Sequence, residues 1–428
     1  MIFKRKLYNK LLAWKHQAAG TKALLIEGAR RIGKSTLVEE FAKNEYRSYL
    51  LIDFNKVSDS VVSAFNNYMN DLDTFFLILS SEYGVKLYSK ESVIIFDEIQ
   101  QFPKARQAIK YLVADGRFDY IETGSLISIK ENVKDITIPS EERALTMYPM
   151  DFEEFAWAMD EEPLMTYIRQ CFDKRVPLEQ GLHAKAMLLF RQYMIVGGMP
   201  KSLSAYMENN RSFEMADMEK RDILTLYRND IMKINSGYRS SVLSIFDQIP
   251  AFLSRSERRV VMNRIEKGAS FPKYHDTFFW LSDSMIANEC FNCSDPNVGL
   301  SLNEDRTYVK CYMGDTGLLI SHTFDENEIS DGELYREILL GKLSVNEGMF
   351  YENVIAQMLV AAGHKLYFYT RYNEEKHRND VEIDFILSNQ SKLKYKIFPI
   401  EVKSNDKYTI RSLTRFNESF HQRIGGIY

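Results

Sequence analysis

The chain has 428 residues, of which 45% are hydrophobic and 27% are charged, and its formal net charge is -4. This length exceeds what one hydrophobic core usually holds, so several domains are expected. The mildly acidic balance gives no global argument for nucleic-acid binding, although a local basic surface is compatible with it. The four cysteines argue against a disulfide framework, and no apolar run approaches the ~20 residues that span a membrane. We therefore expect a cytoplasmic protein with no membrane partner.

One stretch carries the clearest chemical pattern. The apolar residues 24–26 lead into Gly28, and after four further residues the chain reads Gly33, Lys34 and Ser35, which matches GxxxxGK[ST]. Glycines let backbone N–H groups surround phosphates, and the first turn of the following helix adds unpaired N–H groups. Lys34 is expected to reach the β- and γ-phosphates of ATP, and Ser35 to ligate Mg²⁺. The alternative is a strand–helix turn with an incidental lysine. The predicted nucleotide-binding residues are Gly28, Ala29, Arg30, Arg31, Ile32, Gly33, Lys34, Ser35 and Thr36.

A second motif supports the first. Residues 93–98 form a buried-strand run that ends in Asp97 and Glu98. In nucleotide hydrolases an acid at this place holds Mg²⁺, and a neighbouring glutamate can polarise the attacking water as a general base. We assign these roles to Asp97 and Glu98, respectively. The two motifs together predict an ATPase.

Further strands and helices alternate around these motifs. Strands at 24–27, 49–54, 93–96 and 118–123 are separated by helical segments, which predicts a parallel sheet with helices on both faces. Thr123 ends the fourth strand and is a candidate sensor of the γ-phosphate, with Ser125 as second choice; a threonine that only satisfies backbone groups is the alternative. Arg143 lies in a loop-like stretch and could sense phosphate or act in trans. A solvated surface arginine fits that composition equally well.

From these motifs onward the chain resembles a known class. GARRIGKST, VIIFDEIQ, ETGSLI and ERALTMYPMDFEEF, in this order, resemble the bacterial and archaeal AAA-type ATPases of the extended AAA+ class. The resemblance continues with GGMP at 197–200 and KCYMGDTGLL at 310–319, to which no chemistry can be assigned. It implies an ATPase core at 1–150 and a helical lid at 151–235. It also favours Arg143 as a nucleotide-sensing residue and a homo-oligomer formed around the nucleotide.

Residues 236–330 read as three helices followed by a hairpin, the pattern of a winged helix, which the resembled families contain here. A DNA-reading winged helix presents a basic, polar recognition helix to base edges. The third helix, at 274–286, instead offers two aspartates and several aromatic residues. The helix before it is basic, with Arg255, Arg258, Arg259, Arg264 and Lys267. This favours packing or docking of a protein partner, with DNA reading as the alternative.

The same region contains a CxxC pair. Cys290 and Cys293 suggest zinc, and Cys311 and His322 could be recruited as further ligands. A structural zinc needs four ligands, and no second paired-ligand cluster follows. Two cysteines without a metal are therefore the preferred interpretation.

Residues 331–428 hold a second set of charged residues. Asp384 and Glu401 lie on two predicted strands, at 381–387 and 397–404; if these strands pair, they share one face with Lys403. Carboxylates hold Mg²⁺, and a lysine beside them stabilises the charge that develops during phosphodiester cleavage. With Glu352 on the preceding helix, the order of these residues resembles that in the PD-(D/E)xK nuclease superfamily. For the C-terminal domain of this chain, the resemblance implies an α/β, restriction-endonuclease-like fold. The resemblance implies metal ligation by Glu352, Asp384 and Glu401, and catalysis by Asp384, Glu401 and Lys403.

One departure affects this interpretation. Ile383 stands where the motif has proline, and the superfamily includes members that keep the fold without cleaving. Two functions therefore remain open. The first is a Mg-dependent ATPase whose nucleotide cycle moves the winged helix and the nuclease-like domain, acting on DNA. The alternative is a nucleotide-controlled protein-docking switch or scaffold whose nuclease-like fold is inert.

Overall fold

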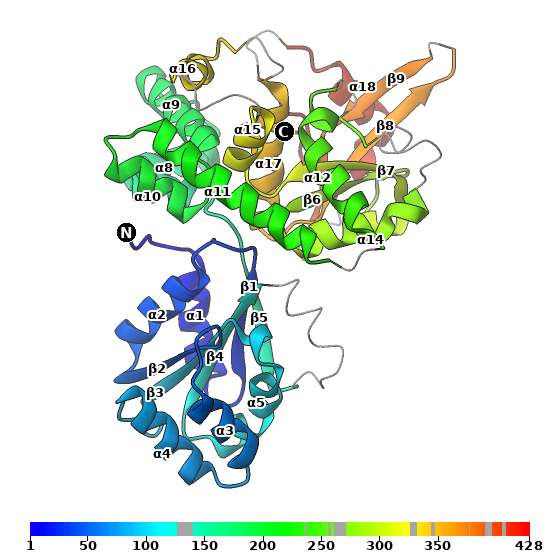
Figure 1. Cartoon of the computed structure of the whole chain (residues 1–428). Helices are drawn as coiled ribbons and strands as arrows, with labels where there is room; N and C mark the ends of the chain where they lie inside the picture. The colour runs from blue at the N-terminus through cyan, green and yellow to red at the C-terminus, as the bar shows by residue number, and fades with distance from the viewer. Residues whose placement is uncertain are drawn as a thin grey trace. The chain divides into compact units, whose positions relative to one another are not determined.

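The structure is a computed structural model of the whole chain. The residues that it describes are 1–125, 140–234, 237–255, 258–260, 271–325, 332–343, 347–375, 377–389, 396–404 and 408–428. The chain forms two compact units: Met1–Met150 with Trp157–Asp160, and Asp151–Ala156 with Glu161–Tyr428 (Figure 1). A finer division at residues 150, 235 and 330 remains a prediction.

The first unit contains a five-stranded parallel sheet of order β2-β3-β4-β1-β5. Its strands are β1 (Ala23–Gly28), β2 (Ser48–Asp53), β3 (Ser92–Asp97), β4 (Asp119–Ser125) and β5 (Glu142–Met147). Its helices are α1 (Leu7–Gln17), α2 (Lys34–Glu45), α3 (Asp59–Asn67), α4 (Leu72–Tyr83) and α5 (Pro103–Asp115). The predicted parallel α/β core is confirmed.

Successive side chains along each strand point to opposite faces of this sheet, so buried residues lie on both faces. Leu25 and Phe96 point to the face where α3, α4 and α5 contribute buried side chains to one cluster. Their sequence neighbours Leu24 and Ile95 are also fully buried, and they point to the opposite face, against which α2 packs. Burial on both faces explains why the central strands read as continuous apolar runs.

Strand β5 corrects one expectation. The sequence analysis placed Arg143 in a loop, whereas residues 142–147 pair parallel to β1, with Arg143 opposite Leu24. β5 is an edge strand, and Arg143 and Ala144 are exposed. Because an edge strand needs few apolar side chains, the stretch lacks the pattern that identified the other strands.

The second unit begins with helices and ends in a mixed α/β region. Its helices are α7 (Phe152–Ala158, shared with the first unit), α8 (Glu162–Lys174), α9 (Gln180–Val196), α10 (Pro200–Glu208), α11 (Phe213–Met232), α12 (Arg239–Leu253), α14 (Phe271–Asp283), α15 (Thr316–Thr323), α16 (Glu333–Leu340), α17 (Gly348–Ala361) and α18 (Arg411–Phe420). Its strands are β6 (Ala287–Cys293), β7 (Glu304–Met313), β8 (Leu366–Asn373), β9 (Arg378–Ile383), β10 (Phe385–Asn389) and β11 (Lys396–Ile400). Among the helices in the described ranges, none is long and apolar enough to cross a membrane.

The hairpin predicted as a wing is part of a larger sheet. β7, β6, β8 and β9 form one four-stranded sheet, in which β6 runs parallel to β8 with Cys290 opposite Leu366. The sheet is thus continuous across the boundary predicted at residue 330. The basic helix predicted at 256–266 falls mostly outside the described residues, and residues 258–260 are not helical. A winged helix therefore remains a prediction.

The two motifs without assigned chemistry, GGMP and KCYMGDTGLL, lie against each other. Asp315 Oδ2 accepts hydrogen bonds from the N–H of Gly198 at 2.6 Å and from Gln357 Nε2 of α17 at 3.1 Å. Its Oδ1 accepts the N–H of Leu318 at 3.0 Å and so caps α15. A single buried carboxylate therefore joins three segments that are far apart in the sequence.

Two glycines allow this close approach. A Cβ on Gly317 would lie 2.6 Å from Gly197 Cα and 2.8 Å from the carbonyl oxygen of Val196. The buried Lys220 also links the two segments, because its Nζ donates to the carbonyl of Ile195 at 2.7 Å and to that of Gly317 at 3.3 Å. The motif glycines are thus explained by packing of backbone against backbone.

We expect Gly317→Ala to lower the free energy of unfolding of the second unit by about 1–3 kcal/mol, the usual cost of overpacking. The clashing atoms at Gly197 and Val196 belong to the backbone and cannot rotate away. Gly237→Ala is the control, because an added Cβ there meets nothing within 4 Å. Urea unfolding of both variants measures the difference, and equal stabilities would contradict the packing argument.

Candidate functional site

The phosphate-binding pattern lies at the carboxyl end of β1, where the chain turns into α2. An added Cβ on Gly28 would lie 2.4 Å from the carbonyl oxygen of Met147 in β5, so only glycine fits. Gly33 has a φ of 90° and forms the N-cap of α2 without a side-chain cap. The first turn of α2 contains no acidic residue, so its N–H groups and dipole suit an anion.

Lys34 is folded into its own loop. Its Nζ donates to the carbonyls of Gly28 at 3.1 Å and Ala29 at 2.7 Å, and the side chain is buried. Burial lowers the pKa of Lys34 to about 8, while Glu98 and Asp97 oppose that shift. A triphosphate in this loop would supply the negative charge that a buried ammonium lacks.

Two hydroxyl groups converge on one carboxylate beside this loop. Ser35 Oγ donates to Asp97 Oδ1 at 2.7 Å, and Thr123 Oγ1 donates to the same oxygen. Ser35 lies in the first turn of α2, Asp97 ends β3, and Thr123 lies in β4 between β3 and β1. Oxygen donors of this kind suit Mg²⁺, so Ser35 and Asp97 could hold the ion that ATP brings.

The remaining predicted residues divide by position. Glu98 follows Asp97 with a left-handed backbone (φ 54°), and its carboxylate accepts a hydrogen bond from Gln100. Ala29 and Ile32 are buried, whereas Arg31 and Thr36 are exposed and Arg30 is half-buried.

Arg143 lies at the other end of the sheet. It pairs with Leu24 at the start of β1, whereas the phosphate loop follows the end of β1. The described residues thus bring together Lys34, Ser35, Asp97, Glu98 and Thr123, but not Arg143. The register therefore does not place Arg143 beside the phosphate loop of its own chain.

The sequence analysis missed a buried acid pair on the α5 face of the sheet. Arg106 of α5 binds Glu142 through two hydrogen bonds, Nε to Oε2 at 3.0 Å and Nη2 to Oε1 at 2.9 Å. Glu122 of β4 is fully buried, and burial followed by the neighbouring Glu142 raises its pKa well above the usual range. A neutral Glu122 beside the Arg106–Glu142 ion pair follows from this arrangement.

The acids predicted in the C-terminal region do converge. The predicted strand at 381–387 is divided at Asp384 into β9 and β10, and β10 pairs antiparallel with β11. Asp384 Oδ2 accepts the N–H of Val402 at 2.8 Å, so Asp384 lies beside the Glu401-x-Lys403 segment. Lys403 forms an ion pair with Glu401. The predicted neighbours are therefore close in space, although Glu401 and Lys403 follow β11 and are not part of it.

A lysine that sequence reasoning missed lies among these acids. Lys310 Nζ is 3.1 Å from Glu352 Oε1, 3.5 Å from Glu382 Oε1 and 3.9 Å from Asp384 Oδ1. Glu352 also accepts a hydrogen bond from Tyr312 and pairs with Arg258. Within the described ranges, no group of three or more His, Cys, Asp or Glu side chains is arranged to hold a metal ion.

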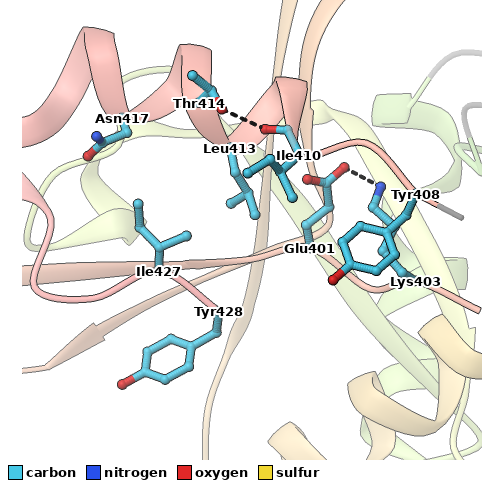
Figure 2. A pocket seen from close by; sticks show the side chains of 9 residues that line it. All are labelled: Glu401, Lys403, Tyr408, Ile410, Leu413, Thr414, Asn417, Ile427 and Tyr428. Carbon is cyan, nitrogen blue, oxygen red and sulfur yellow. Dashed lines mark hydrogen bonds and ion pairs between the residues drawn. The ribbon is translucent and has the colours of Figure 1, made fainter. Parts of the chain in front are cut away.

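A pocket opens beside Glu401 (Figure 2), with a volume of about 530 Å³. Its lining residues are Glu401, Lys403, Tyr408, Ile410, Leu413, Thr414, Asn417, Ile427 and Tyr428. Apart from the charged pair, the wall consists mainly of aliphatic and aromatic side chains. It is suited to an apolar group more than to a polyphosphate.

The zinc candidates are buried. Burial raises the pKa of the Cys290 and Cys311 thiols, and it raises that of Cys293 to about 11. His322 stacks on Phe246 with ring centroids 4.8 Å apart. Packing therefore accounts for these four side chains.

The parallel sheet, the glycine loop and the Ser35–Asp97 pair define an α/β P-loop core of the ATPase class. Residues 20–156 match the family model described as an AAA domain. Residues 187–328 and 347–425 match two domains of unknown function, DUF8612 and DUF4143. Among curated proteins, none matches this chain.

Solved structures similar to this chain include three AAA-type proteins. AMPPCP-bound DnaA from Aquifex aeolicus is 9% identical, with a TM-score of 0.27 over 66% of this chain and 90% of its own. Cdc6p from Pyrobaculum aerophilum is 10% identical, with a TM-score of 0.27 over 75% and 93%. The RuvB Holliday junction branch migration motor of Thermotoga maritima is 13% identical, with a TM-score of 0.29 over 67% and 89%. These low values carry no functional argument.

We expect Arg106→Met to lower the free energy of unfolding of the first unit by about 3–5 kcal/mol, because it leaves Glu142 buried without its partner.

Glu122→Gln should instead raise the free energy of unfolding of the first unit at neutral pH. The folded wild type keeps a proton that the unfolded chain releases above about pH 4.5, so its stability falls as pH rises. Glutamine removes that dependence.

Urea unfolding between about pH 5 and pH 7 measures both effects in the two variants and the wild type. If Glu122→Gln destabilises the unit as much as Arg106→Met, Glu122 is ionised and the assignment is wrong.

Proposed function

We propose that the first unit binds and hydrolyses Mg-ATP. The observation that carries this is the convergence of Ser35 and Thr123 on Asp97, next to a glycine loop with a buried lysine. Lys34 would bind the β- and γ-phosphates, and Ser35 and Asp97 would hold Mg²⁺, which neutralises phosphate charge. Glu98 would take a proton from the attacking water, and Thr123 would sense the γ-phosphate.

We expect Lys34→Ala to abolish ATP binding, and Glu98→Gln to keep binding while slowing hydrolysis by about 10²–10⁴-fold. Fluorescent-nucleotide titration and phosphate release measure the two steps separately. Lys43→Ala is the control, since Lys43 is an exposed lysine of α2 paired with Glu39. Unchanged phosphate release in both test variants would remove these assignments.

Arg143 is proposed to act in trans within a homo-oligomer. Its position at the amino end of β5 supports this, because the phosphate loop of the same chain lies at the opposite end of the strands. The role then requires two copies.

An equimolar mixture of inactive Arg143→Ala and Lys34→Ala chains should recover ATPase activity, because one supplies an intact loop and the other an intact arginine. About a quarter of wild-type activity is expected from random mixing, because half of the loops are intact and half of their neighbours carry the arginine. Arg143→Lys is the conservative comparison. Full activity of Arg143→Ala alone, or no recovery on mixing, would contradict the trans role.

The nucleotide cycle is proposed to control the second unit, in either of two ways. One is action on DNA through a winged helix and a nuclease-like site that uses Glu352, Asp384, Glu401 and Lys403. The other is docking of a protein partner to a scaffold that does not cleave. The buried contacts of Lys310 with the acids favour the second function, because they satisfy charges that a metal would otherwise balance.

A further inference from the structure

The C-terminal acids are surrounded by positive charge from the protein itself. Lys310 Nζ, fully buried, approaches Glu352, Glu382 and Asp384 within 4 Å, and Arg258 forms an ion pair with Glu352. These distances are those of an ammonium among carboxylates. Two cations therefore face three carboxyl groups. The Glu401–Lys403 pair beside them is neutral.

Lys310 is held in place from several sides. Its position on β7 is fixed opposite Cys290 of β6, and the ring of Phe368 on β8 lies 5.0 Å from its Nζ. Tyr312, two residues further on the same face of β7, donates its hydroxyl to Glu352. The ammonium therefore belongs to the folded core of the sheet and is not a surface side chain that could swing away.

Two of the acids that the nuclease motif assigns to a metal, Glu352 and Asp384, thus already have partners within the protein. Mg²⁺ demands near-octahedral oxygen ligands at about 2.0–2.1 Å and strong negative charge around it. Glu352 is committed to Lys310, Tyr312 and Arg258, and Asp384 accepts the N–H of Val402. The residues present do not fit a divalent cation while Lys310 is there.

We infer that Lys310 acts as a built-in cation that replaces the divalent metal at the nuclease-like site, so this site folds without metal and does not cleave phosphodiesters. The inference concerns the second unit alone and does not depend on ATP hydrolysis. It also gives the KCYMGDTGLL motif a role: its first residue supplies the charge, and its tyrosine orients Glu352.

The test measures Mn²⁺ binding by electron paramagnetic resonance on the full chain without nucleotide. Only the Mn²⁺ binding that Asp384→Asn removes is counted, so that ions bound at the phosphate loop are excluded. The wild type should show none, and chelator should leave its melting temperature unchanged. Lys310→Met should melt at a lower temperature and gain a Mn²⁺ site that a second Asp384→Asn change removes.

Lys365→Met is the matched control, because it removes the lysine of an exposed ion pair with Glu304 and should create no site. Lys310→Arg keeps the charge and should bind no Mn²⁺. If Lys310→Met folds but gains no ion, the inference is wrong.

If Lys310→Met does not fold, two measurements on the wild type still test the role of Lys310. Mn²⁺ binding that Asp384→Asn and Glu352→Gln both remove would overturn the inference, as would Mn²⁺-dependent plasmid nicking that Asp384→Asn abolishes. Absence of both supports it. Loss of ATPase activity in Lys34→Ala would affect neither measurement, so the two proposals fail separately.

Discussion

The position of β4 between β1 and β3 determines how the nucleotide site is assembled. Parallel strands bring their carboxyl ends to one edge, which is where ligands bind in open α/β sheets. The strand order therefore places Thr123 between Ser35 and Asp97, and both hydroxyl groups reach the same carboxylate oxygen. The same parallel pairing places Arg143 beside the amino end of β1, at the other end of the strands. The strand order thus decides which of the predicted residues lie together within one chain and which does not.

A comparable constraint in the second unit is the buried carboxylate of Asp315. Burial raises its pKa, while hydrogen bonds from Gly198 and Leu318 and the charge of Lys220 favour the ionised form. Replacing such a group by an apolar one would leave two backbone N–H groups without acceptors. The carboxylate therefore fixes the glycine contact between α9 and α15, and Gln357 extends that contact to α17.

The sequence predicted the parts of the structure that depend on local spacing. The phosphate loop, the acids after β3 and most of the helices were readable, because a phosphate cradle and an amphipathic helix need particular residue types at short, fixed intervals. Strand β5 was not, since an edge strand lacks an apolar run. The contact between Gly198 and Asp315 spans 117 positions, and that between Lys310 and Glu352 spans 42. Such long-range pairs leave no periodic signal in a single sequence.

Lys310 shows why a motif of charged residues is weaker evidence than a motif of glycines. Glycine is required in such a loop because a Cβ atom would clash with neighbouring atoms, and every other residue has a Cβ atom. A carboxylate cluster is selected by charge, and any cation that reaches it can satisfy it, whether a metal ion or a lysine from a neighbouring strand. The sequence shows Glu352, Asp384 and Glu401 in the same order whether a metal ion or a lysine balances their charge. The chemistry of the cluster is therefore decided by β7, a strand that lies outside the motif altogether.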